Sequence, residues 1–342
     1  MSDLTVAVVG ATGAVGRVMR DTLADRSFPV GELRLMASER SAGTVLSTGF
    51  GGVEVEDLAT ADPSGIDIAL FSAGGDRSRE HAPRFAEAGA IVIDNSSAFR
   101  MDPDVPLVVA DVNDEAALNH DGIIANPNCT TMVLMMAVAP LHRAAGLEGM
   151  VATSYQSVSG TGNSAITELV EQVDFFSKTP RALIDGGWED PEPQVFTRPI
   201  GWNVLPFAGN EVEDGYTDEE MKLQNESRKI LDIPNLLVEP TCVRVPTVVG
   251  HGIAASLWFR DPVTPEQAAK VIDEAPGVEV WADRTATPLD SAGIDEVLVS
   301  RIRRTLGEQG GISLWAVGDN LRKGAALNAV QIAECLVDDG LL

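Results

Sequence analysis

The first third of the chain alternates between short apolar runs and segments with helical periodicity. Runs of apolar and β-branched residues, typical of buried strands, cover residues 4–9, 32–37, 66–71, 90–93 and 106–110. Patterns typical of helices follow the first run as far as Leu23 and cover Arg79 to Ala88. This alternation predicts a doubly wound parallel sheet, in which ligands bind at the carboxyl ends of the strands.

The pattern changes after residue 145. Residues 150–159 alternate like a half-exposed strand, and residues 236–249 and 252–259 are typical of long antiparallel strands joined by a turn. Thr217 and Glu220 fit a capping box that starts a helix. The remaining segments are predicted as a helix over 165–176, a long ordered loop over 179–215, a strand over 312–317 and a final amphipathic helix through Leu336.

The 342 residues are enough for two domains with their own cores. We predict an α/β protein whose first domain, residues 1–130 with 320–342, has a Rossmann-like doubly wound parallel sheet. The second domain, residues 131–319, is predicted as α+β with a mostly antiparallel sheet.

The composition argues against several classes of function. The formal net charge is −26, from 51 acidic and 25 basic residues, so nucleic acid and anionic membranes are poor partners. No apolar segment reaches the roughly 18–20 residues of a membrane span, and the chain starts without the pattern of a signal peptide. Three cysteines without close pairing fit a reducing cytoplasm, and the CxxC spacings of a zinc site are absent, so no metal is predicted.

Lysine is scarce, with five among the 25 basic residues. A heavily acidic, lysine-poor surface favours a host that accumulates salt, where ions screen the repulsion between like charges. The alternative is an ordinary acidic protein.

A glycine-rich turn follows the first strand. Gly10, Gly13 and Gly16 have the spacing GxxGxxG between a strand and a helix, a variant of the dinucleotide fingerprint. Such glycines let the backbone approach a pyrophosphate, which then lies on the helix N-terminus. We therefore predict a dinucleotide cofactor here.

The second strand indicates which dinucleotide is bound. Ser38, Arg40 and Ser41 follow it, and an arginine with hydroxyl groups suits the 2′-phosphate of NADP. Glu39 lies among them, and an acidic residue would suit the ribose of NAD. Arg40 favours NADP, and a solvated turn is the alternative.

Candidate reactive residues lie at the ends of the later strands. Gly74, Ser96 and Arg100 follow two of them, and Cys129 follows the run that ends in Asn126-Pro127-Asn128. The apolar segment from Met132 to Val138 is typical of a buried helix, so Cys129 would lie in the turn that leads into its N-terminus, and the positive end of a helix favours a thiolate over a thiol. The alternative is an ordinary buried thiol.

Two further features bear on Cys129 as a nucleophile. Of the four histidines, His251 lies between two glycines in an apolar strand turn, where its ring is approachable and suits general acid–base catalysis. Cys242 is the rival thiol, but it lies in mid-strand, and Cys335 on the last helix is typical of a core position.

At this point the chain resembles the aspartate-β-semialdehyde dehydrogenase family over essentially its whole length. The resemblance rests on GATGAVG (10–16), SERSAG (38–43), NPNCTT (126–131), YQSVSG (155–160), DEEMK (218–222), RVPTVVGHG (244–252) and DNLRKGAA (319–326). Members reduce 4-phospho-L-aspartate to the aldehyde with NADPH, on the route to lysine, methionine, threonine and diaminopimelate. The resemblance also implies a catalytic and dimerisation role for the second domain and a homodimer or homotetramer.

The family's roles fall on matching positions. By this resemblance Cys129 would be the acyl-forming nucleophile with Asn128 beside it, His251 the acid/base, and Gln156 the residue that positions the acyl group. Arg244 would hold the substrate carboxylate and Glu219 its ammonium.

Phosphate and cofactor complete the implied site. Arg100 and Lys222 would hold the phosphate, although Glu219 and Lys222 could equally form a plain surface ion pair. The cofactor would be held by Gly10, Thr12, Gly13, Ala14, Val15, Ser38, Arg40, Ser41, Gly74, Ser159, Gly160 and Asn320.

Two other functions stay open. One is another acyl-phosphate reductase, such as N-acetyl-γ-glutamyl-phosphate reductase, although an acetylated amine has no charge to pair with Glu219. The other is a non-catalytic NADP-sensing protein on the same scaffold, which would need neither Cys129 nor His251.

Overall fold

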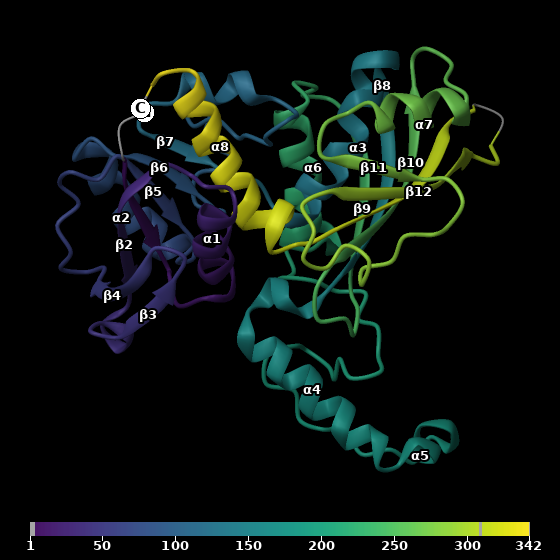
Figure 1. The fold of residues 1–342 in the computed structure, drawn as a ribbon. Helices are drawn as coiled ribbons and strands as arrows, with labels where there is room; N and C mark the ends of the chain where they lie inside the picture. The colour runs from purple at the N-terminus through teal and green to yellow at the C-terminus, as the bar shows by residue number, and fades with distance from the viewer. Residues whose placement is uncertain (1–3, 308–309, 342) are drawn as a thin grey trace.

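A computed structural model describes residues 4–307 and 310–341 and arranges them around two β-sheets (Figure 1). The first sheet has seven strands in the order β3-β4-β2-β1-β5-β6-β7, and all neighbours are parallel except β3 and β4. Its strands are β1 (Leu4–Val9), β2 (Val30–Ala37), β3 (Val45–Thr48), β4 (Gly51–Asp57), β5 (Ile68–Phe71), β6 (Ile91–Asp94) and β7 (Ile123–Ala125).

Helices cover both faces of this sheet. Val6 and Val8 of β1 pack in one core with α1 (Ala14–Asp25) and α8 (Leu327–Asp338). Ala7 and Val9 face the opposite core, with α2 (Gly75–Glu87). The predicted doubly wound parallel sheet is confirmed, and the last helix of the chain packs on the first sheet.

The second sheet has six strands in the order β11-β12-β13-β10-β8-β9. Its three central pairings are antiparallel and the two outer ones are parallel, so the expected mostly antiparallel sheet is confirmed. The strands are β8 (Leu147–Gln156), β9 (Leu237–Arg244), β10 (His251–Phe259), β11 (Val278–Trp281), β12 (Val297–Arg304) and β13 (Ile312–Gly318).

The expected antiparallel pairing of residues 236–249 with 252–259 is wrong. β8 lies between β9 and β10, and β9 runs parallel to β8. The connecting residues pass over the end of β8, because Val245 N donates to Gln156 O at 2.9 Å and Val158 N to Thr247 O at 2.9 Å. His251 is therefore the first residue of β10 and does not lie in a hairpin turn.

The buried helix predicted after Cys129 is α3 (Cys129–Ala145), which is apolar on all sides and lies in the core of the second sheet. It packs between the strands and two further helices, α6 (Asp218–Ile230) and α7 (Pro265–Asp273). The capping box predicted at Thr217 and Glu220 is present at the start of α6.

Other segments differ from expectation. Residues 106–110 form no strand, and only Leu107 makes an isolated bridge, to Ala125. The expected loop over 179–215 contains α5 (Pro180–Asp185), which follows α4 (Asn163–Ser177) in an arm that extends away from both sheets (Figure 1). Short helical turns are Glu39–Ser41, Asp114–Asn119, Val158–Thr161, Glu213–Gly215 and the π-helical Arg322–Ala326.

Among residues 4–307 and 310–341, no helix is both long and apolar enough to cross a membrane.

Candidate active site

Cys129 and His251 meet where α3 and β10 begin. The Cys129 Sγ lies 3.3 Å from the His251 Nε2. Cys129 is the first residue of α3, and the side chain of Asn128 caps that helix by accepting from the Thr130 N–H at 2.9 Å. The thiol therefore lies at a helix N-terminus with an imidazole in contact, a geometry that a nucleophile and its acid/base require.

The other ring nitrogen of His251 is held from behind. Its Nδ1 lies 3.1 Å from the Ser157 N–H, which can only donate, so the proton of the neutral ring lies on Nε2 and faces Cys129. Ser157 Oγ also lies 3.1 Å from Nδ1 and donates to Asn320 Oδ1 at 3.0 Å. Asn320 Oδ1 accepts from the Gly250 N–H, so this buried amide ties the residues around His251 together.

Burial sets the charge of this pair. It raises the pKa of the Cys129 thiol to about 11, with the Glu219 carboxylate acting in the same direction. Burial, followed by the positive charge of Arg244, lowers the pKa of His251 to about 3. Near neutral pH the resting pair is a thiol and a neutral imidazole. Burial and the Glu219 carboxylate thus oppose the helix N-terminus, which by itself favours the thiolate.

Arg244 is a buried cation without a matching carboxylate. It is 6% exposed, and among the described residues it forms no salt bridge. One terminal nitrogen donates to Ser157 O at 2.8 Å, while its Nε has no partner among the described atoms. Arg244 lines a cavity of about 320 Å³ together with Glu219, Lys222 and Phe196. A buried guanidinium beside a cavity is a site for an anion.

Glu219 and Lys222 share one face of α6, as their spacing predicts. Lys222 Nζ lies 2.7 Å from Glu219 and 2.8 Å from Asp218. Burial works to raise the pKa of Glu219, but Lys222, Arg244 and Asn128 outweigh it and lower this pKa to about 2. Glu219 Oε2 also accepts from Asn128 Nδ2 at 3.0 Å, so the pair is part of the site and more than a surface ion pair.

Gln156 ends β8 beside these groups. Its Nε2 donates to Thr130 Oγ1 at 2.9 Å and lies 3.5 Å from Glu219 Oε2. The side chain is 1% exposed, so these contacts fix it next to the first turn of α3.

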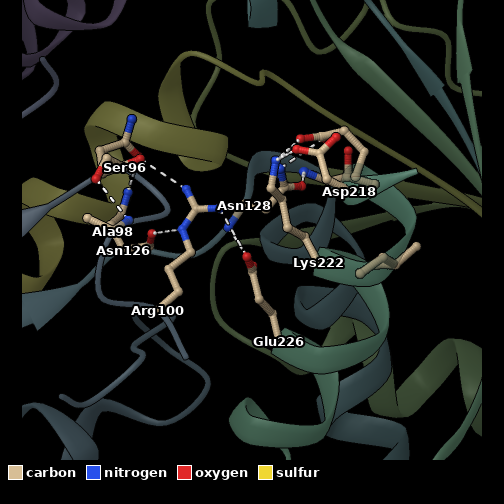
Figure 2. Close-up of polar contacts among 12 residues, drawn as sticks. Ser96, Ala98, Arg100, Asn126, Asn128, Asp218, Lys222 and Glu226 are labelled. Atoms are coloured by element: carbon tan, nitrogen blue, oxygen red, sulfur yellow. Dashed lines mark hydrogen bonds and ion pairs between the residues drawn. The ribbon is translucent and has the colours of Figure 1, made fainter. Parts of the chain in front are cut away.

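Arg100 lies at the centre of Figure 2, held by three groups. Its Nε donates to Asn126 O at 2.9 Å, one terminal nitrogen to Asn95 O at 3.0 Å, and the other to Glu226 Oε1 at 3.0 Å. Three of its five N–H groups are thus used, and the rest remain for a ligand.

The glycine-rich turn lies between β1 and α1. Gly10 has φ +87°, and a Cβ there would come within 2.2 Å of Ser72 O, so this position requires glycine. Gly13 caps α1 without a side-chain hydrogen bond, and Thr12, Ala14 and Val15 flank it. The first N–H groups of α1 are thereby available to a phosphate.

One cavity of about 290 Å³ brings many of the predicted residues together. Its lining includes Val15, Gly74, Ser96, Arg100, Asn128, Cys129, Gly160, Glu219, Lys222 and Asn320. A Cβ at Gly160 would lie 3.5 Å from both His251 Nε2 and an Arg244 nitrogen, so glycine keeps this approach open. Ser159 is buried next to it and hydrogen-bonds Asn320.

Ser38, Arg40 and Ser41 lie outside this cavity. They form the turn after β2, which neighbours β1 in the sheet, and Arg40 is exposed. They therefore follow a strand end beside the glycine-rich turn, away from Cys129.

Sequence reasoning missed Ser157 and Glu226. Glu226 lies four residues after Lys222 and seven after Glu219, a spacing that places all three on one helical face. This helical spacing could have indicated Glu226 as a further site residue. Ser157 acts partly through its backbone N–H, which no residue pattern reveals. No cluster of His, Cys, Asp or Glu that could hold a metal occurs in the described part of the chain.

Comparison with known proteins adds to this geometry. Two family models match: "Semialdehyde dehydrogenase, NAD binding domain" over residues 5–120 and "Semialdehyde dehydrogenase, dimerisation domain" over residues 138–323. The aspartate-semialdehyde dehydrogenase of Streptomyces akiyoshiensis is 53% identical over 336 residues, 97% of this chain and 98% of the relative. The structure of aspartate semialdehyde dehydrogenase II from Vibrio cholerae, complexed with ASA, is 44% identical, with a TM-score of 0.93 and 99% of each chain covered.

The fold and these matches define an NAD(P)-dependent oxidoreductase. Its first sheet corresponds to the NAD-binding model, and its candidate site brings a thiol and an imidazole into contact. The chain belongs to the aspartate-semialdehyde dehydrogenase family, as the sequence motifs indicate.

Proposed function

We propose that the protein reduces 4-phospho-L-aspartate to L-aspartate 4-semialdehyde with NADPH through a thioester on Cys129. The observation that carries this proposal is the 3.3 Å contact between His251 and the Cys129 thiol, because Cys129 lines a cavity together with Arg100 and Lys222. The product would serve lysine, methionine, threonine and diaminopimelate biosynthesis.

The substrate's amino-acid end would lie between Arg244 and Glu219. Arg244 lacks an anionic partner among the described residues, and its planar guanidinium suits a carboxylate. Glu219 stays ionised because of its lowered pKa and would hold an ammonium group. Gln156, fixed beside Thr130, would position the acyl group. These contacts orient the reacting carbon toward Cys129.

The first chemical step is acyl transfer. The S–C bond forms, the C–O bond to phosphate breaks, and the thiol proton leaves with the phosphate as hydrogen phosphate. A neutral thiol can therefore enter this step without net charge separation. Arg100 and Lys222 would stabilise the departing phosphate through charge-assisted hydrogen bonds.

His251 serves the reduction that follows. Bound NADPH supplies the hydride that reduces the thioester. The Nε2–H of His251 faces Cys129 Sγ and would donate a hydrogen bond to the oxygen that becomes negative on the attached carbon. When the C–S bond breaks, the aldehyde is released and a solvent proton restores the thiol.

The first sheet fits a dinucleotide. Gly10 provides the left-handed turn, and the uncapped start of α1 offers N–H groups to a pyrophosphate. Gly74, Ser159, Gly160 and Asn320 would lie along the path to Cys129, and Ser38, Arg40 and Ser41 would hold a 2′-phosphate, which favours NADP over NAD. We accordingly propose that residues 1–130 with 320–342 bind the cofactor and residues 131–319 carry catalysis.

A homodimer is the proposed assembly. The dimerisation model covers residues 138–323, which include all of the second sheet. α3 covers one face of that sheet, while Val151 and Leu237 on its strands are 43% and 71% exposed. Exposed apolar side chains on an open sheet face suit a partner surface.

A direct assay tests the proposed function. With L-aspartate 4-semialdehyde and NADP, the enzyme should form NADPH only when phosphate is present. If NADPH forms equally fast without phosphate, the proposed acyl-phosphate chemistry is refuted. A preference for N-acetyl-glutamate semialdehyde would favour the alternative reductase, and NADP binding without turnover would favour a sensor.

A further inference from the structure

Glu226 connects the Arg100 guanidinium with the turn that leads to Cys129. Its Oε1 lies 3.0 Å from an Arg100 nitrogen, and its Oε2 accepts from the Asn128 N–H at 2.7 Å. Both partners of the ion pair are buried, Glu226 to 1% and Arg100 to 6% exposure. In Figure 2 Glu226 extends from α6 toward Arg100 from the side opposite Ser96.

Carboxylates balance both cations of the proposed phosphate site. Arg100 is paired with Glu226, and Lys222 is paired with Asp218 and Glu219. Two positive charges thus face three negative ones before any ligand binds. A phosphate dianion entering this site is attracted less strongly than the presence of an arginine and a lysine suggests.

Glu226 is not the only residue that holds Arg100 in position. Asn126 O and Asn95 O hold two of its nitrogens. Lys229, one turn beyond Glu226 on α6, donates to the backbone oxygen of Arg100 at 2.9 Å. Because these contacts would survive without the Glu226 charge, the main effect of that charge is on the potential at Arg100.

We propose that Glu226 lowers the affinity of the active site for phosphate, so that phosphate departs readily after acyl transfer. This inference rests on the proposed function, in which Arg100 holds the phosphate. Glu226 acts through Arg100 and is therefore a positioning and charge-setting residue.

The variant Glu226→Gln should change the KM for phosphate in the direction opposite to that expected from structural damage. In Glu226→Gln one negative charge is lost beside Arg100, and the KM for phosphate in the oxidative direction should fall by roughly tenfold. The KM for the semialdehyde should stay within about twofold. Phosphate should inhibit the reductive direction more strongly by the same factor. A merely structural role predicts the reverse, a higher KM for phosphate.

Two variants control this result. Glu226→Asp keeps the charge, and its KM for phosphate should not fall. Glu168→Gln neutralises another buried carboxylate, which accepts from the Gln194 and Val195 N–H groups and forms no ion pair with Arg100 or Lys222 among the described residues, and it should leave the KM for phosphate unchanged. If Glu226→Gln turns over too slowly for a KM to be measured, phosphate binding can be followed by the protection of Cys129 against iodoacetamide. The variant should then reach half-protection at about tenfold less phosphate than the parent enzyme.

The outcomes separate the inference from the proposed function. If Arg100→Lys raises the KM for phosphate but Glu226→Gln leaves it unchanged or raises it, the inference is overturned. Equal decreases in Glu226→Gln and Glu226→Asp would also overturn it, because charge would not be the cause. If Arg100→Lys leaves phosphate kinetics unchanged, the phosphate role proposed for Arg100 fails, and the inference fails with it.

Discussion

The Cys129 sulfur and the His251 Nε2 lie 3.3 Å apart although the two residues are 122 positions apart along the chain. Both are the first residue of their element, Cys129 of α3 and His251 of β10. Cys129 lines a cavity, and His251, which contacts it, is fully buried. A rigid helix and a rigid strand thus hold the two reactive groups in contact, which flexible loops would do less precisely.

Removing the nucleophile separates catalysis from folding. Cys129→Ser should abolish turnover while NADP binding and the melting temperature change little, because serine's hydroxyl is a far weaker nucleophile than a thiol. The matched control is Cys242→Ser: that thiol is fully buried in β9, and burial raises its pKa to about 12. An inactive Cys242→Ser with an active Cys129→Ser would show that the nucleophile is misassigned.

The pKa of Cys129 predicts how its reactivity depends on pH. Because burial raises this pKa to about 11, the thiolate fraction should rise about tenfold per pH unit throughout the neutral range. The rate of iodoacetamide alkylation should therefore keep rising up to at least pH 9. Cys129→Ser provides the background from Cys335. A plateau near pH 7 would mean that the resting enzyme already holds a thiolate.

Several elements could be predicted from sequence because their signals are local. The run from Leu4 to Val9, the glycines after it and the capping box at Thr217 act through neighbours in the chain, and all lie where expected. The partner of β9 could not be predicted in this way. Which strand lies beside it depends on how residues 245–250 cross the end of β8, a contact between distant segments.

The site shows the same division. Residue types and motifs predicted roles for Cys129, His251, Arg244 and Glu219, whereas the pKa of Cys129 depends on how far the fold buries its thiol. The helix N-terminus is visible in the sequence, but the opposing burial is not. The helical spacing of Glu226 from Glu219 and Lys222 is visible in the sequence, but its contact with Arg100, more than one hundred residues away, is not.

Arg40 tests the choice of cofactor. Arg40→Ala should raise the KM for NADPH by roughly tenfold to a hundredfold, with little effect on NADH, because only NADPH carries the 2′-phosphate that an arginine would bind. Glu39→Ala, in the same exposed turn, is the matched control. Equal losses with both cofactors in Arg40→Ala would mean that this arginine does not read the 2′-phosphate.

Salt tests the meaning of the acidic composition. At 1 M salt the Debye length is about 3 Å, so repulsion within a chain of net charge −26 is largely screened. The melting temperature should therefore rise clearly as KCl increases into the molar range. Sucrose at matched osmolality should reproduce less of this rise. A flat or falling melting temperature would contradict adaptation to a salt-rich host.

Glu219 and Arg244 test the identity of the substrate. Arg244→Lys keeps the charge but loses the planar fork, so kcat/KM should fall with every carboxylate-bearing substrate, at any phosphate concentration. Glu219→Gln should instead affect only a substrate with an ammonium group. It should lower kcat/KM for L-aspartate 4-semialdehyde by roughly tenfold to a hundredfold, the cost of about 1.5–3 kcal/mol for a lost charge-assisted contact.

An N-acetylated analogue is the discriminating control for Glu219→Gln, because its amide carries no charge for a carboxylate to bind. Its kcat/KM should be low in the parent enzyme and change little in the variant. Glu219 also contacts Lys222 and Asn128, so a general disturbance of the site would lower activity with both substrates alike. Equal losses would therefore assign Glu219 to holding Lys222, and an unchanged rate with the free-amine substrate would favour the acetylated alternative.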